Sequence, residues 1–324
     1  MLTSDEVSLA YRLYLGREPE NADVVNNLCQ TVHTVSELRA AFMESPEFRK
    51  LMGEELDKQQ QIRHRHPFTS PHIPVESEVS DEVLSKMFDR IHDEWSNLGI
   101  IEPYWSVITQ PQFYRAEFES NRMQFFKSGK SVCTVFLSAL RRNGINPNLL
   151  ETCLEVGCGV GRVTASLAQN FKQVIAVDIS QPHLDLTKEI LAKENIHNVE
   201  FQQWRNMGSL YQIPAVDAIF TVITLQHNPP PIIAWILRAL LYSLKPGGIA
   251  YFQIPTYKNG YLFEAERYLE TQMPKDFEMH FLPQKDVFKI IAGENCALLE
   301  VREDPMVGEE NIMLSNTFLV QKNA

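Results

Sequence analysis

The chain lacks the cysteine pattern of a disulfide-stabilised or zinc-binding protein. Its five cysteines are odd in number and widely spaced, and no two of them form a Cys-x-x-Cys pair. A disulfide framework needs an even set of cysteines, and a zinc ribbon needs closely spaced pairs, so neither class fits. The sequence therefore predicts a reduced, cytoplasmic protein without a metal site.

Positive charge and long apolar runs are also scarce. Lys and Arg total 30 against 41 Asp and Glu, which gives a formal net charge of -11. Nucleic-acid binding requires clustered Lys and Arg, so we expect no nucleic-acid partner. The longest apolar run, Ile232 to Leu244, contains Arg238 and falls short of the roughly 20 residues that span a bilayer. The first residues show neither the basic nor the apolar region of a secretory signal. We expect neither a membrane span nor a signal peptide.

Residues 1–57 contain short apolar patterns of helical period. One pattern begins near Val7, is interrupted at Gly16 and Pro19 and resumes at Val24, and residues 36–50 repeat it. This spacing predicts a compact module of short helices. The segments YRLYLGREPE and SELRAAFMESPEF resemble a small bacterial helical domain of unknown function, related to phycobilisome-linker repeats and found beside surface-polysaccharide enzymes. The resemblance implies protein docking through residues 1–57 and no chemistry of its own.

The next segment, residues 58–80, is polar and rich in proline, which predicts a linker. Its histidines, His64, His66 and His72, raise the alternative of a metal site. They have no Cys or carboxylate partners at metal-ligand spacing, so a solvated basic linker is favoured.

Residues 81–143 are expected to form a helical cap region, with Ser80 as the N-cap of its first helix. Aromatic side chains are dense between residues 95 and 126, where they build either a helical core layer or the wall of a pocket. Tyr104 and Trp105 fall in an expected loop, where core packing explains aromatic residues less well.

A strand, a glycine-rich turn and a helix follow one another in LEVGCGVGRVTASLA, Leu154 to Ala168. Gly157, Gly159 and Gly161 are spaced two residues apart. A dinucleotide-binding turn needs its third glycine one position later, where this chain has Arg162. The spacing therefore disfavours a nicotinamide-dependent dehydrogenase.

Two acids accompany this turn. Glu155 precedes it on the first strand, and Asp178 ends the next apolar strand, Val174 to Val177. An acid at the end of the second strand can accept hydrogen bonds from both ribose hydroxyls. For Glu155 the alternative is an ordinary strand-end acid facing solvent. Glycine turn, helix, strand and terminal acid in this order favour a cofactor that contains a ribose but no pyrophosphate.

Strands and helices continue to alternate after Asp178. We expect helices at residues 185–194 and 230–244, and strands at 199–203, 216–224 and 249–254. Such alternation predicts an α/β protein with a parallel sheet, whose ligand site lies at the carboxyl ends of the strands.

From about Ser120 to its end the chain resembles the class I S-adenosylmethionine-dependent methyltransferases that act on small molecules. The resemblance implies a Rossmann-like domain over residues 144–324, with a mostly parallel seven-stranded sheet whose last strand is antiparallel. It implies S-adenosyl-L-methionine as cofactor and S-adenosyl-L-homocysteine as product. By motif, the cofactor-binding residues are Glu155, Gly157, Cys158, Gly159, Gly161, Asp178 and Ile179.

The chain departs from the family after the third strand, where an acid commonly meets the adenine amine. Here FQQWRNMGSL offers Asn206, whose side-chain carbonyl can accept the amine hydrogen, and Met207, which can pack on the adenine. Because similar enzymes fold N-terminal helices over the cofactor, Tyr104 and Trp105 become candidates for a lid.

His227, in TLQHNPPP after the fourth strand, is the candidate catalytic base, since histidine titrates near neutral pH. The alternative is a structural histidine that supports the loop. Gln226 and Tyr257 are candidate acceptor contacts. The leading hypothesis is O- or N-methylation of a small molecule or a glycan unit, the glycan being suggested by the N-terminal module. The rival hypothesis is an inactive scaffold with a methyltransferase fold.

Overall fold

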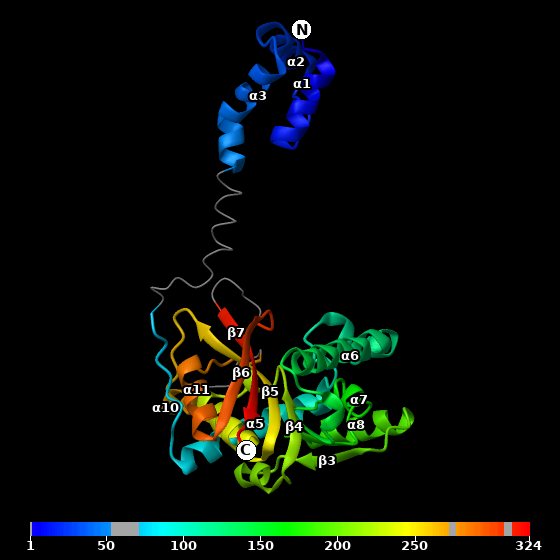
Figure 1. Ribbon diagram of the computed structural model, residues 1–324, viewed down its shortest axis with the longest axis vertical. Coiled ribbons are helices and arrows are strands. Elements are labelled where there is room, and N and C mark those ends of the chain that lie inside the picture. Colours follow the sequence, from blue (N-terminus) through cyan, green and yellow to red (C-terminus); the bar gives the residue numbers. More distant parts are fainter. Residues whose placement is uncertain (1, 53–70, 272–276, 308–312) are drawn as a thin grey trace. The chain divides into compact units, whose positions relative to one another are not determined.

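The computed structural model describes residues 2–52, 71–271, 277–307 and 313–324 (Figure 1). The chain divides into two compact units, Met1–Thr69 and Ser70–Ala324. Residues 58–70 of the expected linker, with His64 and His66, lie outside the described residues. His72 is described and exposed, and its Nε2 lies 2.8 Å from Nζ of Lys285. Within the described residues, no helix is both long and apolar enough to cross a membrane, and no three His, Cys, Asp or Glu side chains are placed to hold a metal.

The N-terminal unit is helical, as the sequence predicts. It contains α1 (Ser4–Ala10), a π-helical turn η1 (Tyr11–Leu15), α2 (Ala22–Thr31) and α3 (Val35–Glu44). Polar residues cap these short helices: Thr3 and Glu6 form a capping box on α1, and Asn21 and Thr34 cap α2 and α3. The buried side chains of this unit are Leu2, Val7, Ala10, Tyr11, Val25, Leu38 and Phe42.

The second unit is built on one seven-stranded sheet of order β3-β2-β1-β4-β5-β7-β6. The strands are β1 (Thr152–Val156), β2 (Gln173–Asp178), β3 (Val199–Gln203), β4 (Val216–Thr221), β5 (Leu244–Lys258), β6 (Cys296–Asp304) and β7 (Met313–Lys322). All strand pairs are parallel except those of β7, which runs antiparallel to both β5 and β6. This sheet confirms the expected Rossmann-like fold. β7 is the exception because it directly follows β6, and consecutive strands without a crossover pair antiparallel.

The helices of this unit are α5 (Asp81–Ile101), α6 (Phe118–Arg142), α7 (Thr164–Leu167), α8 (Gln181–Lys193), α9 (Pro230–Tyr242), α10 (Ala265–Glu270) and α11 (Gln284–Gly293). Short 3-10 turns join them at η2 (Pro111–Phe113), η3 (Pro147–Leu149), η4 (Met207–Gln212) and η5 (Leu225–His227). Ser80 caps α5, as expected, by accepting a hydrogen bond from the Val83 amide. The helix expected after the glycine turn is α-helical only over α7.

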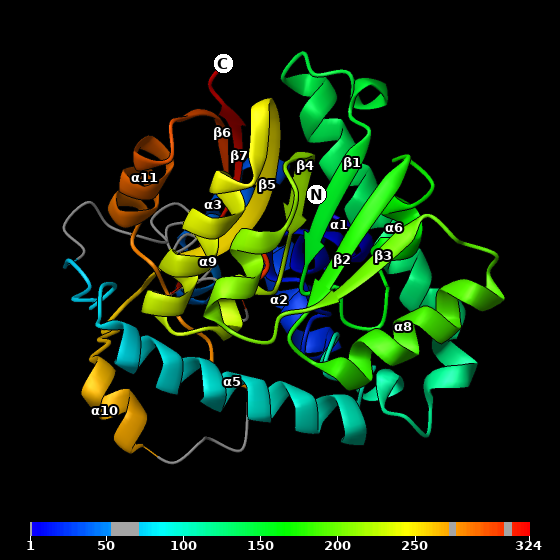
Figure 2. The same cartoon turned by 90° about the horizontal axis from the view of Figure 1, so that it is seen from below.

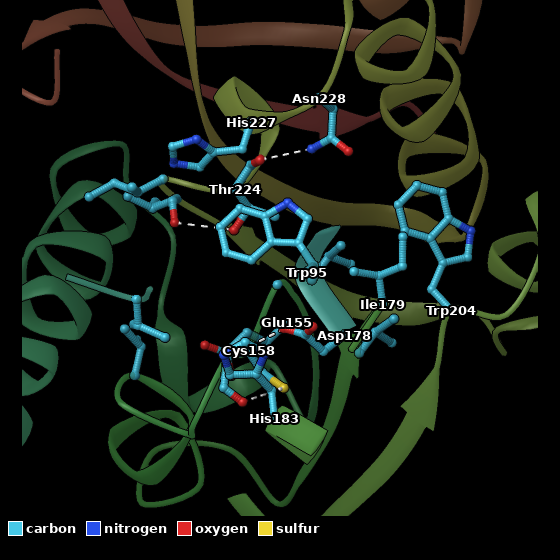
Figure 3. A pocket seen from close by; sticks show the side chains of 18 of the residues that line it. Trp95, Glu155, Cys158, Asp178, Ile179, His183, Trp204, Thr224, His227 and Asn228 are labelled. Atoms are coloured by element: carbon cyan, nitrogen blue, oxygen red, sulfur yellow. Dashed lines mark hydrogen bonds between the residues drawn. The ribbon is translucent and has the colours of Figure 1, made fainter. Parts of the chain in front are cut away.

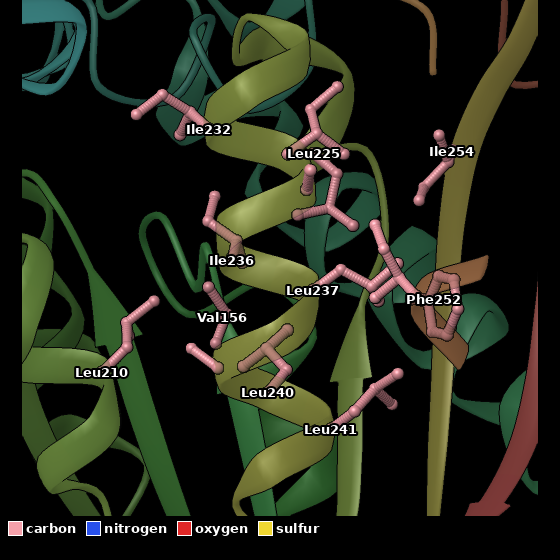
Figure 4. Packing of buried hydrophobic residues seen from close by; sticks show 14 of the residues in the cluster. Val156, Leu210, Leu225, Ile232, Ile236, Leu237, Leu240, Leu241, Phe252 and Ile254 are labelled. Carbon is pink, nitrogen blue, oxygen red and sulfur yellow. The ribbon is translucent and has the colours of Figure 1, made fainter. Parts of the chain in front are cut away.

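The largest hydrophobic core lies where α9 packs on the sheet. Ile236, Leu237 and Leu240 of α9 are buried against Val156 of β1 and Phe252 of β5 (Figure 4). Burying each such side chain stabilises the fold by roughly 1.5–3 kcal/mol. The same core includes residues of α5 and α11, and α5 also contacts α8 (Figure 2). Residues of α6 and α7 form a separate core on the opposite face of the sheet.

The strand order places a topological switch at β1. The chain leaves β1 for β2 on one side and later returns to β4 on the other side. Crossovers in opposite directions open a crevice at the carboxyl ends of these strands, which is where open α/β sheets bind ligands. The glycine turn and the loop after β4 both lie at this end.

Candidate functional site

The glycine turn has a backbone that only glycine adopts without strain. Gly157 and Gly159 have φ angles of 77° and 54°, in the left-handed region that disfavours side chains. A Cβ on Gly157 would lie 2.2 Å from Oγ1 of Thr224, and one on Gly159 would lie 2.6 Å from Cγ2 of Val107. The turn is therefore pressed against the loop after β4 on one side and against the loop after α5 on the other.

Asp178 ties the end of β2 to this turn. One carboxylate oxygen accepts a hydrogen bond from the Gly159 amide at 2.8 Å, and the other accepts one from the Ser180 amide at 2.9 Å. Thr187 of α8 donates to the Gly159 carbonyl at 2.7 Å. The carboxylate is thus held in a fixed position at the carboxyl edge of the sheet, where it lines the pocket.

Glu155 is a buried carboxylate with an unsatisfied oxygen. Its side chain is 3% exposed, and Oε2 has no hydrogen-bond partner. Burial raises the pKa of Glu155 to about 8, while nearby Thr164 and Arg162 act in the opposite direction. Because native proteins rarely bury a polar atom without a partner, this oxygen indicates a place for a ligand group. The solvent-facing alternative for Glu155 does not match this burial.

A pocket lies at the carboxyl ends of β1, β2 and β4 (Figure 3). It encloses about 920 Å³ of space, counting the part open to solvent. In the view of Figure 3, Glu155 and Asp178 lie toward one end, and His227 and Asn228 lie toward the other. Its walls are mainly apolar with a few convergent polar groups, which is typical of a small-molecule site.

His227 lines this pocket as a neutral imidazole. The pKa of His227 is lowered to about 4, chiefly by burial and to a smaller extent by nearby His280, while the hydrogen bond to the Glu278 carbonyl opposes this shift. Nδ1 lies 3.0 Å from that carbonyl oxygen, so Nδ1 carries the proton and donates it. Nε2 is left with a lone pair, 3.3 Å from the Gln226 side-chain nitrogen. The ring is flanked by Trp95, and the Nε2 lone pair accepts a hydrogen bond from Gln226.

This depressed pKa predicts a specific acid sensitivity of the fold. In the unfolded chain His227 takes up a proton below its ordinary pKa of 6.5, whereas in the folded protein it does so only near 4. Stability should therefore fall as the pH drops from 6.5 toward 4. We expect His227→Gln to lose less unfolding free energy than the natural protein between pH 7 and pH 5, by on the order of 1–2 kcal/mol.

Urea denaturation at several pH values measures this difference. His197→Gln is the matched control, because His197 is exposed and its loss should leave the pH dependence unchanged. Parallel pH dependences for His227→Gln and the natural protein would contradict the lowered pKa of His227.

The loop after α5 covers the glycine turn. His183 at the start of α8 holds this loop, since its Nε2 lies 2.9 Å from Oγ of Ser106 and 3.2 Å from the Pro103 carbonyl. Ser106 and Val107 line the pocket. The residues that reach the site from this loop are thus the two that follow Tyr104 and Trp105.

Several residues expected at the site do line the pocket. They are Glu155, Gly157, Cys158, Gly159, Asp178, Ile179 and His227. Other candidates have their contacts elsewhere. The Tyr104 ring stacks on Phe118 with centroids 3.4 Å apart, and Trp105 stacks on Tyr114 at 5.2 Å. Neither ring lines the pocket.

Four more candidates also lie outside the pocket lining: Gly161, Met207, Gln226 and Tyr257. Gly161 packs against Thr187 of α8, and Met207 packs at the edge of the main core. Asn206 lines an adjoining hollow after β3, which shares Val177 and Trp204 with the main pocket. Its side chain takes part in a capping box with Ser209 on η4.

Sequence reasoning missed several lining residues, among them Ile91, Trp95, Arg162, His183, Trp204, Thr224 and Asn228. Thr224 and Asn228 flank His227, so proximity to that motif was a usable signal. Trp95 and Ile91 come from α5, more than fifty positions before the glycine turn, and no local pattern distinguishes them from core residues.

Comparison with known proteins agrees with this geometry. Residues 153–248 match a family model described as a methyltransferase domain. A ubiquinone biosynthesis O-methyltransferase from Acinetobacter baumannii is 30% identical over 127 residues, which cover 38% of this chain and 52% of that protein. The enzyme of the same name from Aeromonas salmonicida is 29% identical over 52% of this chain and 71% of its own length. The chain thus spans about half the length of the first curated relatives it matches.

Among solved structures, magnesium protoporphyrin IX methyltransferase from Synechocystis PCC 6803, with bound S-adenosylhomocysteine, superposes with a TM-score of 0.52. It is 14% identical, and the match covers 73% of this chain and all of that one. At 14% identity, this structural similarity establishes the fold alone. The Ser70–Ala324 unit therefore has the class I methyltransferase fold, and its pocket lies where that fold binds its ligands.

Proposed function

We propose that this protein is an S-adenosylmethionine-dependent methyltransferase that acts on a small acceptor. The observation behind the proposal is the buried carboxylate of Glu155, whose Oε2 has no partner, beside a left-handed glycine turn that Asp178 holds in place. The match of residues 153–248 to a methyltransferase domain supports the same conclusion.

The residues present fit the cofactor at each of its polar ends. Glu155 Oε2 and the Arg162 Nε are both buried without partners, and they suit the ammonium and carboxylate of the methionine part. The Asp178 carboxylate suits the ribose hydroxyls. Ile179 and Trp204 offer apolar surface for the adenine, and Asn206 in the adjoining hollow suits its amine. When bound, S-adenosylmethionine supplies an electrophilic methyl group.

His227 is proposed to receive the proton that the acceptor releases. Its Nδ1 is fixed by the Glu278 carbonyl, and an acceptor hydroxyl would take the place of Gln226 at the lone pair of Nε2. A base of low pKa suffices for a hydroxyl, because the hydroxyl becomes strongly acidic as its oxygen forms the new bond to carbon. The remaining acceleration comes from alignment of the acceptor in the pocket. This favours O-methylation, the reaction named for the curated relatives, over N-methylation.

We further propose a glycan unit as one acceptor class, together with a docking role for residues 1–57. The support is the resemblance of this helical segment to a domain found beside surface-polysaccharide enzymes. Exposed apolar side chains on the unit, such as Leu13 and Val35, are available for docking. All five cysteines are free thiols, which is consistent with a cytoplasmic location.

Calorimetry followed by a labelling assay tests the proposal. We expect one molecule of S-adenosylhomocysteine to bind per chain with micromolar affinity. We also expect the protein to transfer labelled methyl groups from S-adenosylmethionine to a component of its host's extract, identified by mass spectrometry. A chain that binds neither cofactor form contradicts the proposal.

The labelled product decides the acceptor. A labelled small molecule supports the main proposal, and a labelled polysaccharide supports the glycan class. Labelled protein or RNA would contradict the acceptor class. Cofactor binding without transfer to any component would identify the chain as an inactive scaffold.

A further inference from the structure

Ile223, in the loop after β4, has a backbone conformation that is rare for its residue type. Its φ angle is 58°, and a β-branched residue in the left-handed region is strained. Such a conformation persists only where the surroundings impose it. Ile223 lines the pocket, and the next residue, Thr224, abuts Gly157 of the glycine turn. The strained position therefore lies between the cofactor loop and the candidate base.

Gln253 of β5 contacts this strained residue directly. Its side chain is fully buried, and its Oε1 accepts a hydrogen bond from the Ile223 amide at 3.0 Å. Its Nε2 donates to Oγ of Ser315 at 2.7 Å and to Oε1 of Gln226 at 3.1 Å. Because the Ile223 amide can only donate, the oxygen of Gln253 must face it and the nitrogen must face Gln226. The oxygen and the nitrogen of the Gln253 side chain therefore both have hydrogen-bond partners, and they have them in only one orientation of the side-chain amide.

Gln226 extends this connection to the pocket. Its side chain is buried, and its backbone carbonyl accepts a hydrogen bond from the His280 backbone amide at 2.8 Å. With its oxygen occupied by Gln253, its side-chain nitrogen faces Nε2 of His227 at 3.3 Å. The other ring nitrogen of His227 is held by the Glu278 carbonyl. One buried amide on β5 therefore influences both the backbone at Ile223 and the ring of His227.

We propose that Gln253 is a positioning residue for methyl transfer. It holds Ile223 in the left-handed conformation and, through Gln226, places a hydrogen-bond donor on Nε2 of His227 that fixes the ring beside the pocket. Gln226 is then a relay in this network instead of a direct acceptor contact. The inference rests on the proposed function for its catalytic consequence, whereas the structural part concerns the protein without ligand.

Three variants separate the parts of this network. Gln253→Met keeps the length of the side chain and removes every hydrogen bond. Gln226→Met removes only the branch to His227. Ser315→Ala removes a partner of Gln253 that touches neither Ile223 nor His227, and it is the matched control.

The first measurements need no activity. By amide hydrogen exchange, we expect the Ile223 amide to exchange at least about 10-fold faster in Gln253→Met, and at the natural rate in the other two variants. By ¹⁵N NMR of the imidazole, we expect a single Nδ1-protonated form in the natural protein and in Ser315→Ala. In Gln253→Met and Gln226→Met we expect this form to persist through the Glu278 carbonyl, with a shifted ¹⁵N resonance at Nε2, which loses the hydrogen bond from Gln226.

The kinetic measurements test the catalytic consequence. We expect kcat to fall about 10- to 100-fold in Gln253→Met and about 10-fold in Gln226→Met, because small misplacements of reacting groups have effects of this size. The affinity for S-adenosylhomocysteine should change less than about threefold, since Gln253 does not line the pocket. Ser315→Ala should stay within about twofold of the natural kcat.

Several results would overturn the inference. Unchanged exchange at Ile223 in Gln253→Met would show that Gln253 does not hold this backbone. An equal loss of kcat in Ser315→Ala would reduce the role of Gln253 to general stability. If Gln253→Met does not fold, Gln226→Met still tests the branch to His227, and an unchanged Nε2 resonance and kcat there would contradict it. A natural protein that binds no cofactor contradicts the proposed function, while amide exchange at Ile223 and the Nε2 resonance of His227 still test the network.

Discussion

Replacement of Asp178 by alanine is expected to lower the affinity for S-adenosylhomocysteine by at least about 100-fold, since charge-assisted hydrogen bonds contribute roughly 1.5–3 kcal/mol each. The carboxylate is proposed to bind the ribose, and it also holds the Gly159 and Ser180 amides at 2.8 and 2.9 Å. Its loss therefore removes a ligand contact and releases the glycine turn at the same time. Calorimetric titration measures the affinity directly.

Two further variants make this result specific. Asp178→Asn keeps the shape of the side chain and one acceptor oxygen. Its affinity for S-adenosylhomocysteine should fall about 10-fold, which is less than in the alanine variant. Asp185→Ala is the matched control, because Asp185 is exposed on α8 and contacts only surface partners such as Gln181. An Asp178→Ala protein that is folded and binds S-adenosylhomocysteine normally would remove Asp178 from the cofactor site.

Glu155→Gln is expected to weaken cofactor binding and to stabilise the protein at alkaline pH. An amide at this position cannot neutralise a cationic group of the ligand, so we expect at least a 10-fold loss of affinity, of the order of a charged hydrogen bond. The stabilisation arises because burial opposes the charged form of Glu155 and raises its pKa to about 8 from an ordinary 4.5. The charged carboxylate is therefore expected to favour cofactor binding and to lower the stability of the ligand-free protein.

The sign of the pH dependence follows from these two values. Below pH 4.5 the carboxyl group is protonated in both the folded and the unfolded chain, so it does not affect stability. Between 4.5 and 8 the unfolded chain loses the proton and the folded chain keeps it, so stability falls as the pH rises. Above about 8 the full cost of a few kcal/mol is present. Glu155→Gln removes this cost, so its Tm should exceed the natural value by about 5–10 °C at pH 8.5 and match it near pH 4.

Thermal unfolding of the ligand-free protein at both pH values checks this prediction. Glu151→Gln is the matched control, since Glu151 is exposed just before β1 and pairs with Lys172. We expect Glu151→Gln to have the same Tm as the natural protein at both pH values and the same cofactor affinity. A lower Tm for Glu155→Gln at pH 8.5 would show that the natural carboxylate already has a compensating partner.

Much of the fold could be predicted because its signals are local. The apolar strand before Gly157, the spacing of the three glycines and the acid after the second strand lie within about 25 consecutive residues. Parallel pairing then brings Asp178 beside the turn, since β1 and β2 are neighbours and their carboxyl ends meet at one edge. The helix boundaries were less predictable. The segment after the turn reads as an amphipathic helix but is α-helical only over Thr164–Leu167.

The role of Gln226 shows why other parts of the site could not be predicted. Beside His227 in the sequence, it reads as an acceptor contact. In the fold its side chain turns to Gln253, 27 residues away on β5. Similarly, Tyr104 and Trp105 read as lid residues, but their rings stack on Phe118 and Tyr114. Packing partners distant in sequence set these side-chain directions, and no periodicity encodes them.

The sequence by itself determined the α/β class, the glycine turn and the acid that accompanies it, because these depend on backbone conformation and strand order, which local residue types control. Only the tertiary structure decided which side chains enclose the pocket. Trp95 reaches it because α5 packs beside α8 and α9. The raised pKa of Glu155 and the lowered pKa of His227 were also decided there, because both follow from burial, and burial is a property of the assembled fold.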